Sequence, residues 1–176
     1  MSSGGGTSRV HGDAGIAARL AGGRLSDVPL DVLRAGLRLP LHDYLGLELT
    51  GLRPVVVEVG LTEHTRSRDA PLHGGVVATL VDVAANIAAA TSGAVDITRY
   101  GLRTARLEVE YHARPNGDRV RAEATVVEVE RRSVRSRCTV TDGDGRRVAS
   151  ALVTVRVLPR GGVAGTGLGP DGDAAC

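Results

Sequence analysis

The residues best suited to chemistry lie together in the segment 73–82. Two glycines, Gly74 and Gly75, open a run of apolar residues, and one carboxylate, Asp82, follows within it. The start of a helix exposes unpaired backbone N–H groups that carry partial positive charge, and such groups stabilise a carbonyl oxygen that gains negative charge. A nearby carboxylate can activate water or attack a carbonyl directly. The pattern therefore indicates acyl-transfer chemistry.

A helix over residues 74–91 is predicted to position these groups. Apolar side chains recur along it at the spacing of one helical face, and Gly93 is expected to end it. A second stripe, roughly opposite, carries the polar side chains of the helix: Gly75, Thr79, Asp82 and Asn86. Spacing alone leaves open whether Asp82 reacts or simply faces solvent. It also leaves open whether the two glycines serve only close packing of the helix against a sheet.

The segments around this helix predict strands. Four later segments alternate apolar and polar residues, as antiparallel strands with one covered face do: 105–112, 120–126, 134–140 and 149–157. Before the helix, the valines of segment 55–59 alternate as in another strand. A short helix through Leu33 and Leu37 is expected upstream, capped by Asp27 or Asp31. The prediction is an α+β fold, with a curved antiparallel β-sheet wrapped around one long central helix.

The 176 residues are expected to form one domain with two tails. Hydrophobic residues make up 42% of the chain, which is enough for a packed core. Because Phe and Trp are absent, this core must be built from Val, Leu, Ile and Ala. Residues 1–25 and 160–176 are rich in glycine and small residues, and we expect them to be disordered. The folded domain is therefore expected over residues 26–159.

Charge and cysteine content exclude several classes of function. The net charge is +2 and no basic run exceeds two residues, so we expect no surface for nucleic acid. Cys138 and Cys176 cannot form a disulfide framework, and the histidines show no metal-ligand spacing. No apolar signal segment opens the sequence, and the longest uncharged run, 83–95, is too short to cross a bilayer. We expect a soluble cytoplasmic protein that binds no metal and contacts no membrane.

Three features together carry a family resemblance. They are the His-Gly-Gly tripeptide at 73–75, the acid Asp82 nine residues after the histidine, and the order of strands around the helix. Segment 107–115 adds a strand that ends at a proline, and segment 144–149 adds a final hairpin. With these features the chain resembles the hotdog-fold thioesterases, and among them the PaaI-type acyl-CoA thioesterases, over roughly residues 40–158.

The resemblance implies an acyl-CoA thioester hydrolase without metal or bound cofactor. Asp82 would act as nucleophile or general base. The backbone N–H of Gly74, with Gly75 as a further donor, would polarise the thioester carbonyl. His73 would brace the loop through hydrogen bonds. In the family the active site forms between two subunits, which implies at least a homodimer, with dimers commonly pairing into a homotetramer.

The resemblance also implies helpers around the acid. Asn86 and Thr79 would assist from the helix, although hydrogen bonding at an interface accounts for Asn86 equally well. The loop before the helix departs from the family, since it lacks the Asn or Gln usually found there. His64 or Ser67 is expected to take the place of this amide in substrate binding.

One turn supplies the last candidates for substrate binding: Arg131, Arg132 and Ser133. Arginine suits phosphate groups geometrically, so this turn is expected to meet coenzyme A, and a solvated turn is the alternative. The missing loop amide favours a rival function, a non-catalytic acyl-CoA-binding hotdog protein. A hotdog dehydratase is a second rival, which the helix-acid pattern argues against. The aliphatic composition allows either an aryl or a medium-chain acyl group.

Overall fold

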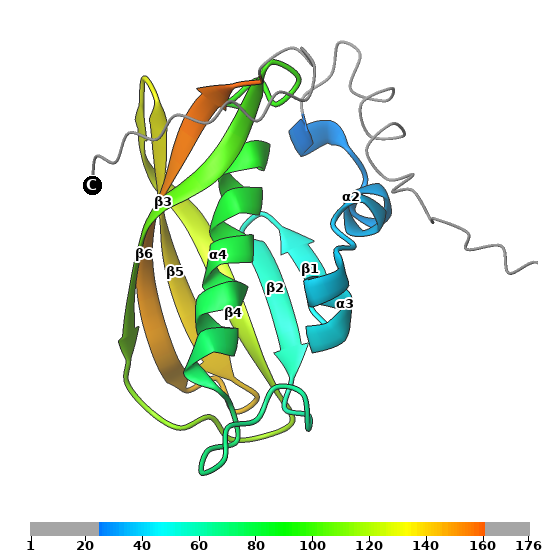
Figure 1. Ribbon diagram of the computed structural model, residues 1–176, viewed down its shortest axis with the longest axis vertical. Coiled ribbons are helices and arrows are strands. Elements are labelled where there is room, and N and C mark those ends of the chain that lie inside the picture. The colour runs from blue at the N-terminus through cyan, green and yellow to red at the C-terminus, as the bar shows by residue number, and fades with distance from the viewer. Residues whose placement is uncertain (1–24, 161–176) are drawn as a thin grey trace, which may run out of the picture.

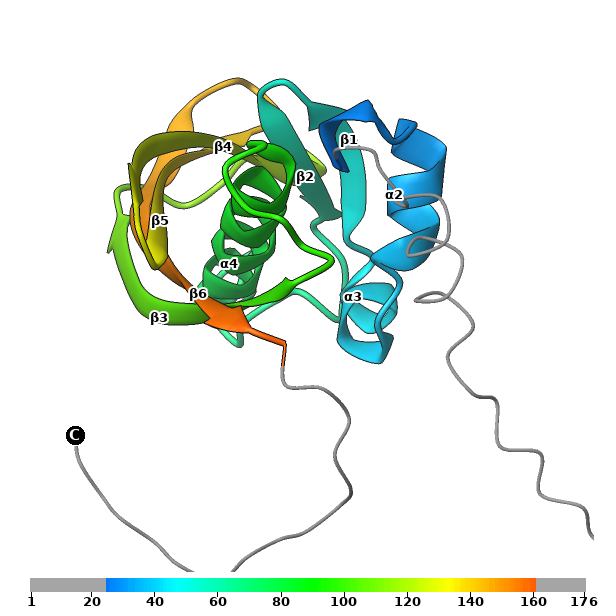
Figure 2. The same cartoon turned by 90° about the horizontal axis from the view of Figure 1, so that it is seen from above.

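The computed structural model describes residues 25–160 of the chain. A curved six-stranded sheet wraps around one long helix, and two short helices lie beside the first strand (Figures 1 and 2). The predicted α+β hotdog fold is therefore confirmed. In chain order the elements are η1 (Leu25–Asp27), α2 (Leu30–Gly36), α3 (Pro40–Leu45), β1 (Glu48–Leu52), β2 (Val55–Gly60), α4 (Gly74–Thr91), β3 (Tyr100–Tyr111), β4 (Arg119–Glu130), β5 (Ser133–Asp142) and β6 (Arg147–Pro159).

The sheet has two free edges, β1 and β3. Its strand order is β1-β2-β4-β5-β6-β3, and every neighbouring pair is antiparallel. The three strands that follow β3 in the chain pair in sequence, and the last of them, β6, pairs along the whole length of β3. β3 thus ends the sheet as a twelve-residue strand whose side chains are mostly exposed.

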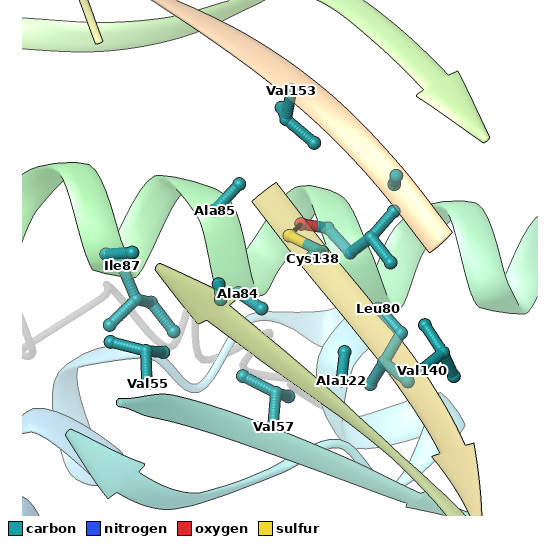
Figure 3. Packing of buried hydrophobic residues seen from close by; sticks show 14 of the residues in the cluster. Val55, Val57, Leu80, Ala84, Ala85, Ile87, Ala122, Cys138, Val140 and Val153 are labelled. Carbon is teal, nitrogen blue, oxygen red and sulfur yellow. Dashed lines mark hydrogen bonds between the residues drawn. The ribbon is translucent and has the colours of Figure 1, made fainter. Parts of the chain in front are cut away.

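The core lies between α4 and the concave face of the sheet (Figure 2). Leu80 is completely buried and lies beside Ala122 and Val140 of the sheet (Figure 3). The second half of α4 buries alanines, whose small side chains let the sheet curve closely around the helix. Alternating inward residues on each strand complete a core of Val, Leu, Ile, Ala and one cysteine, as the composition predicts.

α4 is long and apolar enough to cross a membrane if judged by length and composition alone. In the folded chain, however, 56% of this helix is buried inside the protein. Its apolar character is explained by the sheet that surrounds it, so α4 is the core helix of the fold.

The predicted elements match the observed ones after the start of α4, and differ before it. The single strand expected around 55–59 is one arm of a hairpin, in which β1 turns into β2 through the cis Arg53–Pro54 peptide. Helix α2 exists, but its N-cap is Pro29 rather than either of the two predicted aspartates. Helix α3 was not predicted. The predicted tails lie outside the described residues, apart from residues 25 and 160.

Candidate active site

The start of α4 is held by its own capping residue and by β3. His73 is the N-cap, and its Nδ1 accepts a hydrogen bond from the Gly75 N–H at 2.9 Å. The Tyr111 hydroxyl donates to the Gly74 carbonyl at 2.9 Å. Within residues 25–160 the Gly74 N–H has no hydrogen-bond acceptor. His73 therefore braces the helix start and occupies the Gly75 donor, which leaves the Gly74 N–H available to a ligand.

A buried threonine fixes the loop that leads into this helix start. Thr65 is fully buried, and its hydroxyl donates to the Gly60 carbonyl at 2.8 Å and accepts from the Thr62 N–H at 2.8 Å. The Thr65 carbonyl in turn accepts from the His73 N–H at 2.8 Å. The end of β2 is thereby tied to the first residue of the α4 cap, although no sequence pattern marked Thr65.

Asp82 carries a carboxylate with one oxygen held and one oxygen open. Oδ1 accepts hydrogen bonds from the Thr104 hydroxyl and from the Asn86 amide, the latter at 3.2 Å. The Asn86 amide also donates to the Thr104 hydroxyl at 2.8 Å, which closes a triangle of three side chains. Oδ2 has no hydrogen-bond partner in the part of the chain that the structure describes. The arrangement orients Asp82 and leaves Oδ2 free to take a proton or attack a carbon.

Thr104 joins this triangle because β3 contains a bulge. The register of β3 against β6 shifts between Thr104 and Arg106. As a result Thr104 pairs with Val155 and Leu107 pairs with Val153, both partners being fully buried. Residues directly opposite each other share a face of the sheet, so Thr104 and Leu107 both face α4. Strict alternation would have placed Thr104 on the outer face, which is why sequence reasoning missed it.

A cavity of about 570 Å³ opens beside Asp82. Asp82, Asn86 and Thr104 line one part of it, and mostly aliphatic residues line the remainder. The carboxylate is half-buried, with the buried Cys138 thiol near it inside the core. Burial, and to a smaller extent the charge of Asp82, raises the pKa of Cys138 to about 12. This thiol is therefore protonated at neutral pH and donates weakly to the Val81 carbonyl.

Gly74 and Asp82 of one chain are too far apart to act on the same carbonyl group. Asp82 lies eight positions after Gly74, which is about 12 Å along the axis of an α-helix. The hydrogen bonds from Thr104 and Asn86 hold the carboxylate near the middle of α4, so it does not reach toward the start of the helix. Reacting atoms must approach to about 3–3.5 Å, so one thioester cannot contact both groups within a single chain.

The remaining predicted residues lie apart from this cluster. Thr79 donates to the Gly75 carbonyl at 3.0 Å, one turn back along α4. His64 packs its ring against Tyr44 of α3, with centroids 4.8 Å apart. Ser67 lines a separate polar cavity on the loop that precedes α4. Neither loop residue lines the cavity beside Asp82.

The β4–β5 turn lies at the opposite end of α4 from Gly74 (Figure 1). Arg131 and Arg132 line a cavity of about 300 Å³ together with residues that follow the C-terminal end of the helix. Ser133 donates from its hydroxyl to Glu130 at 2.8 Å. Both arginine side chains are exposed, so this turn presents two cations to solvent.

No group of three or more potential metal ligands occurs within residues 25–160. The groups beside the cavity are a carboxylate, an amide and a hydroxyl, and a free backbone N–H lies at the start of the same helix, about 12 Å away. Carboxylate catalysis assisted by a helix N-terminus matches this set of groups.

Comparisons with known proteins agree with this arrangement. Residues 71–149 match the family model described as "Thioesterase superfamily". A comparison with the curated proteins found no match.

Several solved structures, two of them named as thioesterases, share the fold. A mutant thioesterase from Pseudomonas aeruginosa is 20% identical in sequence and superposes with a TM-score of 0.71. The match covers 76% of this chain and 96% of that chain. A thioesterase from Haemophilus influenzae is 16% identical, with a TM-score of 0.68 and coverages of 75% and 92%. A Bacillus halodurans protein solved with CoA is 20% identical, with a TM-score of 0.60 and coverages of 69% and 77%. The matched segment and the shared architecture together confirm the resemblance of this chain to the hotdog-fold thioesterase superfamily.

Proposed function

We propose that this protein is an acyl-CoA thioesterase of the PaaI type, which hydrolyses a thioester to a free acid and coenzyme A. One observation carries the proposal: Asp82 has one oxygen fixed by Asn86 and Thr104 and the other open to a cavity. The match of residues 71–149 to the thioesterase superfamily supports it. The similar Bacillus halodurans protein, solved with CoA, supports coenzyme A as the thiol.

Asp82 serves this reaction in either of two ways. As a general base, Oδ2 takes a proton from water, whose oxygen attacks the thioester carbon. As a nucleophile, Oδ2 attacks that carbon itself and forms an anhydride, which water then hydrolyses. In both cases the C–S bond breaks and the coenzyme A sulfur leaves as thiolate or, after protonation, as thiol. Because a thioester is already an activated acyl group, the proposed reaction involves no metal or bound cofactor.

The oxyanion donor comes from a second copy of the chain in this proposal. The separation of Gly74 from Asp82 requires that the Gly74 N–H of one subunit meets the Asp82 of its partner. A homodimer is then the smallest active unit, and we infer that dimers pair into a homotetramer. The exposed edge of β3 supports such an assembly, because an unpaired strand edge is a natural site for association.

Arg131 and Arg132 are proposed to contact the phosphates of coenzyme A. Both are exposed cations on one turn, and arginine pairs well with phosphate oxygens. Gly75, His73 and Thr79 are proposed to support the site by shaping the helix start rather than by touching the acyl carbon. We propose that this reaction takes place in the cytoplasm.

Release of coenzyme A from a panel of acyl-CoA thioesters tests the proposal. The native protein is expected to release coenzyme A from at least one of them. Asp82→Asn, which keeps the size of the side chain, is expected to lower kcat by roughly a hundredfold or more. Gly74→Pro removes the N–H at the first helical position, where proline is well tolerated, and is expected to lower kcat by about a hundredfold. Full activity of Asp82→Asn would contradict the proposed role of the acid.

A non-catalytic acyl-CoA-binding protein is the second candidate. The loop that precedes α4 offers no Asn or Gln, and neither His64 nor Ser67 lines the cavity beside Asp82. Tight binding of acyl-CoA without any release of coenzyme A would favour this candidate over the thioesterase.

A further inference from the structure

Resting on the proposed thioesterase activity, we propose that the cavity beside Asp82 is a pocket for a straight aliphatic acyl chain. The N-terminal helices α2 and α3 form one of its walls.

The walls of the cavity are mostly aliphatic and come from three parts of the chain. Side chains from the η1–α3 region, from α4 and from β3 contribute: Leu25, Leu33, Leu37, Leu39, Ile87 and Leu102. Among residues 25–160, no Phe, Tyr or Trp lines the cavity. Leu33 and Ile87 are buried, and Leu39 is 49% exposed. A mostly apolar pocket with a few polar groups is the usual form of a small-molecule site. Here the polar groups are the three around Asp82, together with His42, Thr91 and Arg103.

The wall formed by the N-terminal helices is fixed to the rest of the fold. Arg34 of α2 donates from Nε to the Leu49 carbonyl of β1 at 2.6 Å. His42 of α3 hydrogen-bonds through Nδ1 to the Leu37 carbonyl at the end of α2, at 2.8 Å. These bonds tie α2 to the sheet and α3 to the end of α2, so this wall of the pocket is anchored to the fold.

The length of the pocket suits a chain of about ten carbons. Along α4 its lining runs from Asp82 to Thr91, which spans about 13 Å at the rise of an α-helix. An extended chain of single bonds advances about 3.6 Å for every three bonds, so roughly eleven bonds cover this span. If each methylene takes about the 30 Å³ of a water molecule, ten of them need roughly 300 Å³. The cavity of about 570 Å³ accommodates them, whereas a single aryl ring would leave most of its length empty.

Two matched tryptophan variants on α3 and its cap test the pocket. Leu39 lines the cavity and is 49% exposed, whereas Leu41, two residues away and 55% exposed, does not line it. We expect the native kcat/KM to rise with chain length to a maximum near decanoyl-CoA and to exceed that for benzoyl-CoA. Leu39→Trp is expected to lower kcat/KM for decanoyl-CoA by about tenfold or more while changing that for acetyl-CoA by less than about twofold. Leu41→Trp is expected to leave the chain-length profile unchanged.

Binding of a non-hydrolysable decanoyl-CoA thioether separates this inference from the proposed function. If no thioester is hydrolysed but the thioether binds, and Leu39→Trp weakens that binding, the catalytic proposal fails and the pocket stands. An equal effect of Leu39→Trp on every chain length, or a preference for benzoyl-CoA, would overturn the pocket. The pocket would also be overturned if Leu39→Trp changed the mass of the protein in sedimentation but left its affinity for the thioether unchanged. In that case the cavity would be a contact between copies of the chain.

Discussion

At the scale of single residues, the proposed catalysis depends on how Asp82 is held. Asn86 lies one turn further along the same helix, and Thr104 reaches Asp82 from β3. Asp82 and Asn86 could be predicted from the sequence, because both lie on one helical stripe and spacing along a helix is regular. Thr104 could not, since its direction depends on a bulge that shifts the register of β3. Likewise, only the structure shows that the His73 side chain caps the Gly75 N–H, while the Gly74 N–H has no acceptor within residues 25–160.

Thr104→Val tests the triangle, because valine keeps the shape of threonine and removes the hydroxyl. A hydrogen bond to a charged group typically contributes about 1.5–3 kcal/mol, so we expect kcat to fall by roughly tenfold or more. KM is expected to change little, since the hydroxyl touches the acid rather than the acyl chain. Steady-state kinetics measure both constants. Thr104→Ser should restore most of kcat, and an unchanged kcat in Thr104→Val would show that the triangle does not orient the acid.

At the scale of elements, the helix and its four following strands were predictable and the N-terminal part was not. Alternation and helical spacing are strong where one face of an element is buried, as in α4 and the strands β4 to β6. The segment before β2 has short elements whose burial depends on neighbours far away in the chain. Helix α3 has six residues, too few to show a period, and β1 is interrupted by a register shift near Gly51.

Thr65→Val tests the loop that positions the start of α4. The substitution leaves the Gly60 carbonyl and the Thr62 N–H without the buried hydroxyl that pairs with them. An unpaired buried polar group costs about 1–3 kcal/mol, so the free energy of unfolding should fall by about that amount in urea titrations. Thr125→Val, on the exposed face of β4, is the matched control and should change it by less than about 0.5 kcal/mol. Equal stability of the two variants would argue against Thr65 as an anchor.

The hairpin between β5 and β6 gives the fold a defined acid sensitivity. The N–H groups of Asn116, Arg146 and Asp144 donate to the Asp142 carboxylate, and they lower its pKa below the ordinary value of 3.8, the Asn116 bond contributing most. Because the pKa of Asp142 is lower in the folded state than in the unfolded state, this carboxylate stabilises the fold at pH values above its unfolded-state pKa. This stabilisation is lost as the pH falls through the folded pKa.

Asp142→Asn should therefore destabilise the protein at neutral pH. The difference in urea midpoint between the two proteins is expected to shrink below pH 3.8, because the native carboxylate becomes protonated there. Urea titrations from neutral pH downward measure this difference. A difference that stays constant down to the lowest pH would contradict the assignment.

At the scale of the whole molecule, a single chain is predicted to hold only part of an active site. The carboxylate and the free N–H lie about 12 Å apart on one rigid helix, and no movement within α4 brings them together. In a symmetric dimer the same surface of each copy meets its counterpart, so each interface would create two identical sites. Each site would take Asp82 from one copy and Gly74 from the other.

Mixing two inactive variants tests this claim most directly. Asp82→Asn and Gly74→Pro are each expected to be nearly inactive for release of coenzyme A. When they are unfolded and refolded together in equal amounts, half of the dimers should be mixed. Each mixed dimer should carry one intact site of two, which gives about a quarter of the native activity. Recovery of activity near that level would support a site shared between copies. No recovery, in mixed dimers confirmed by mass spectrometry, would contradict it.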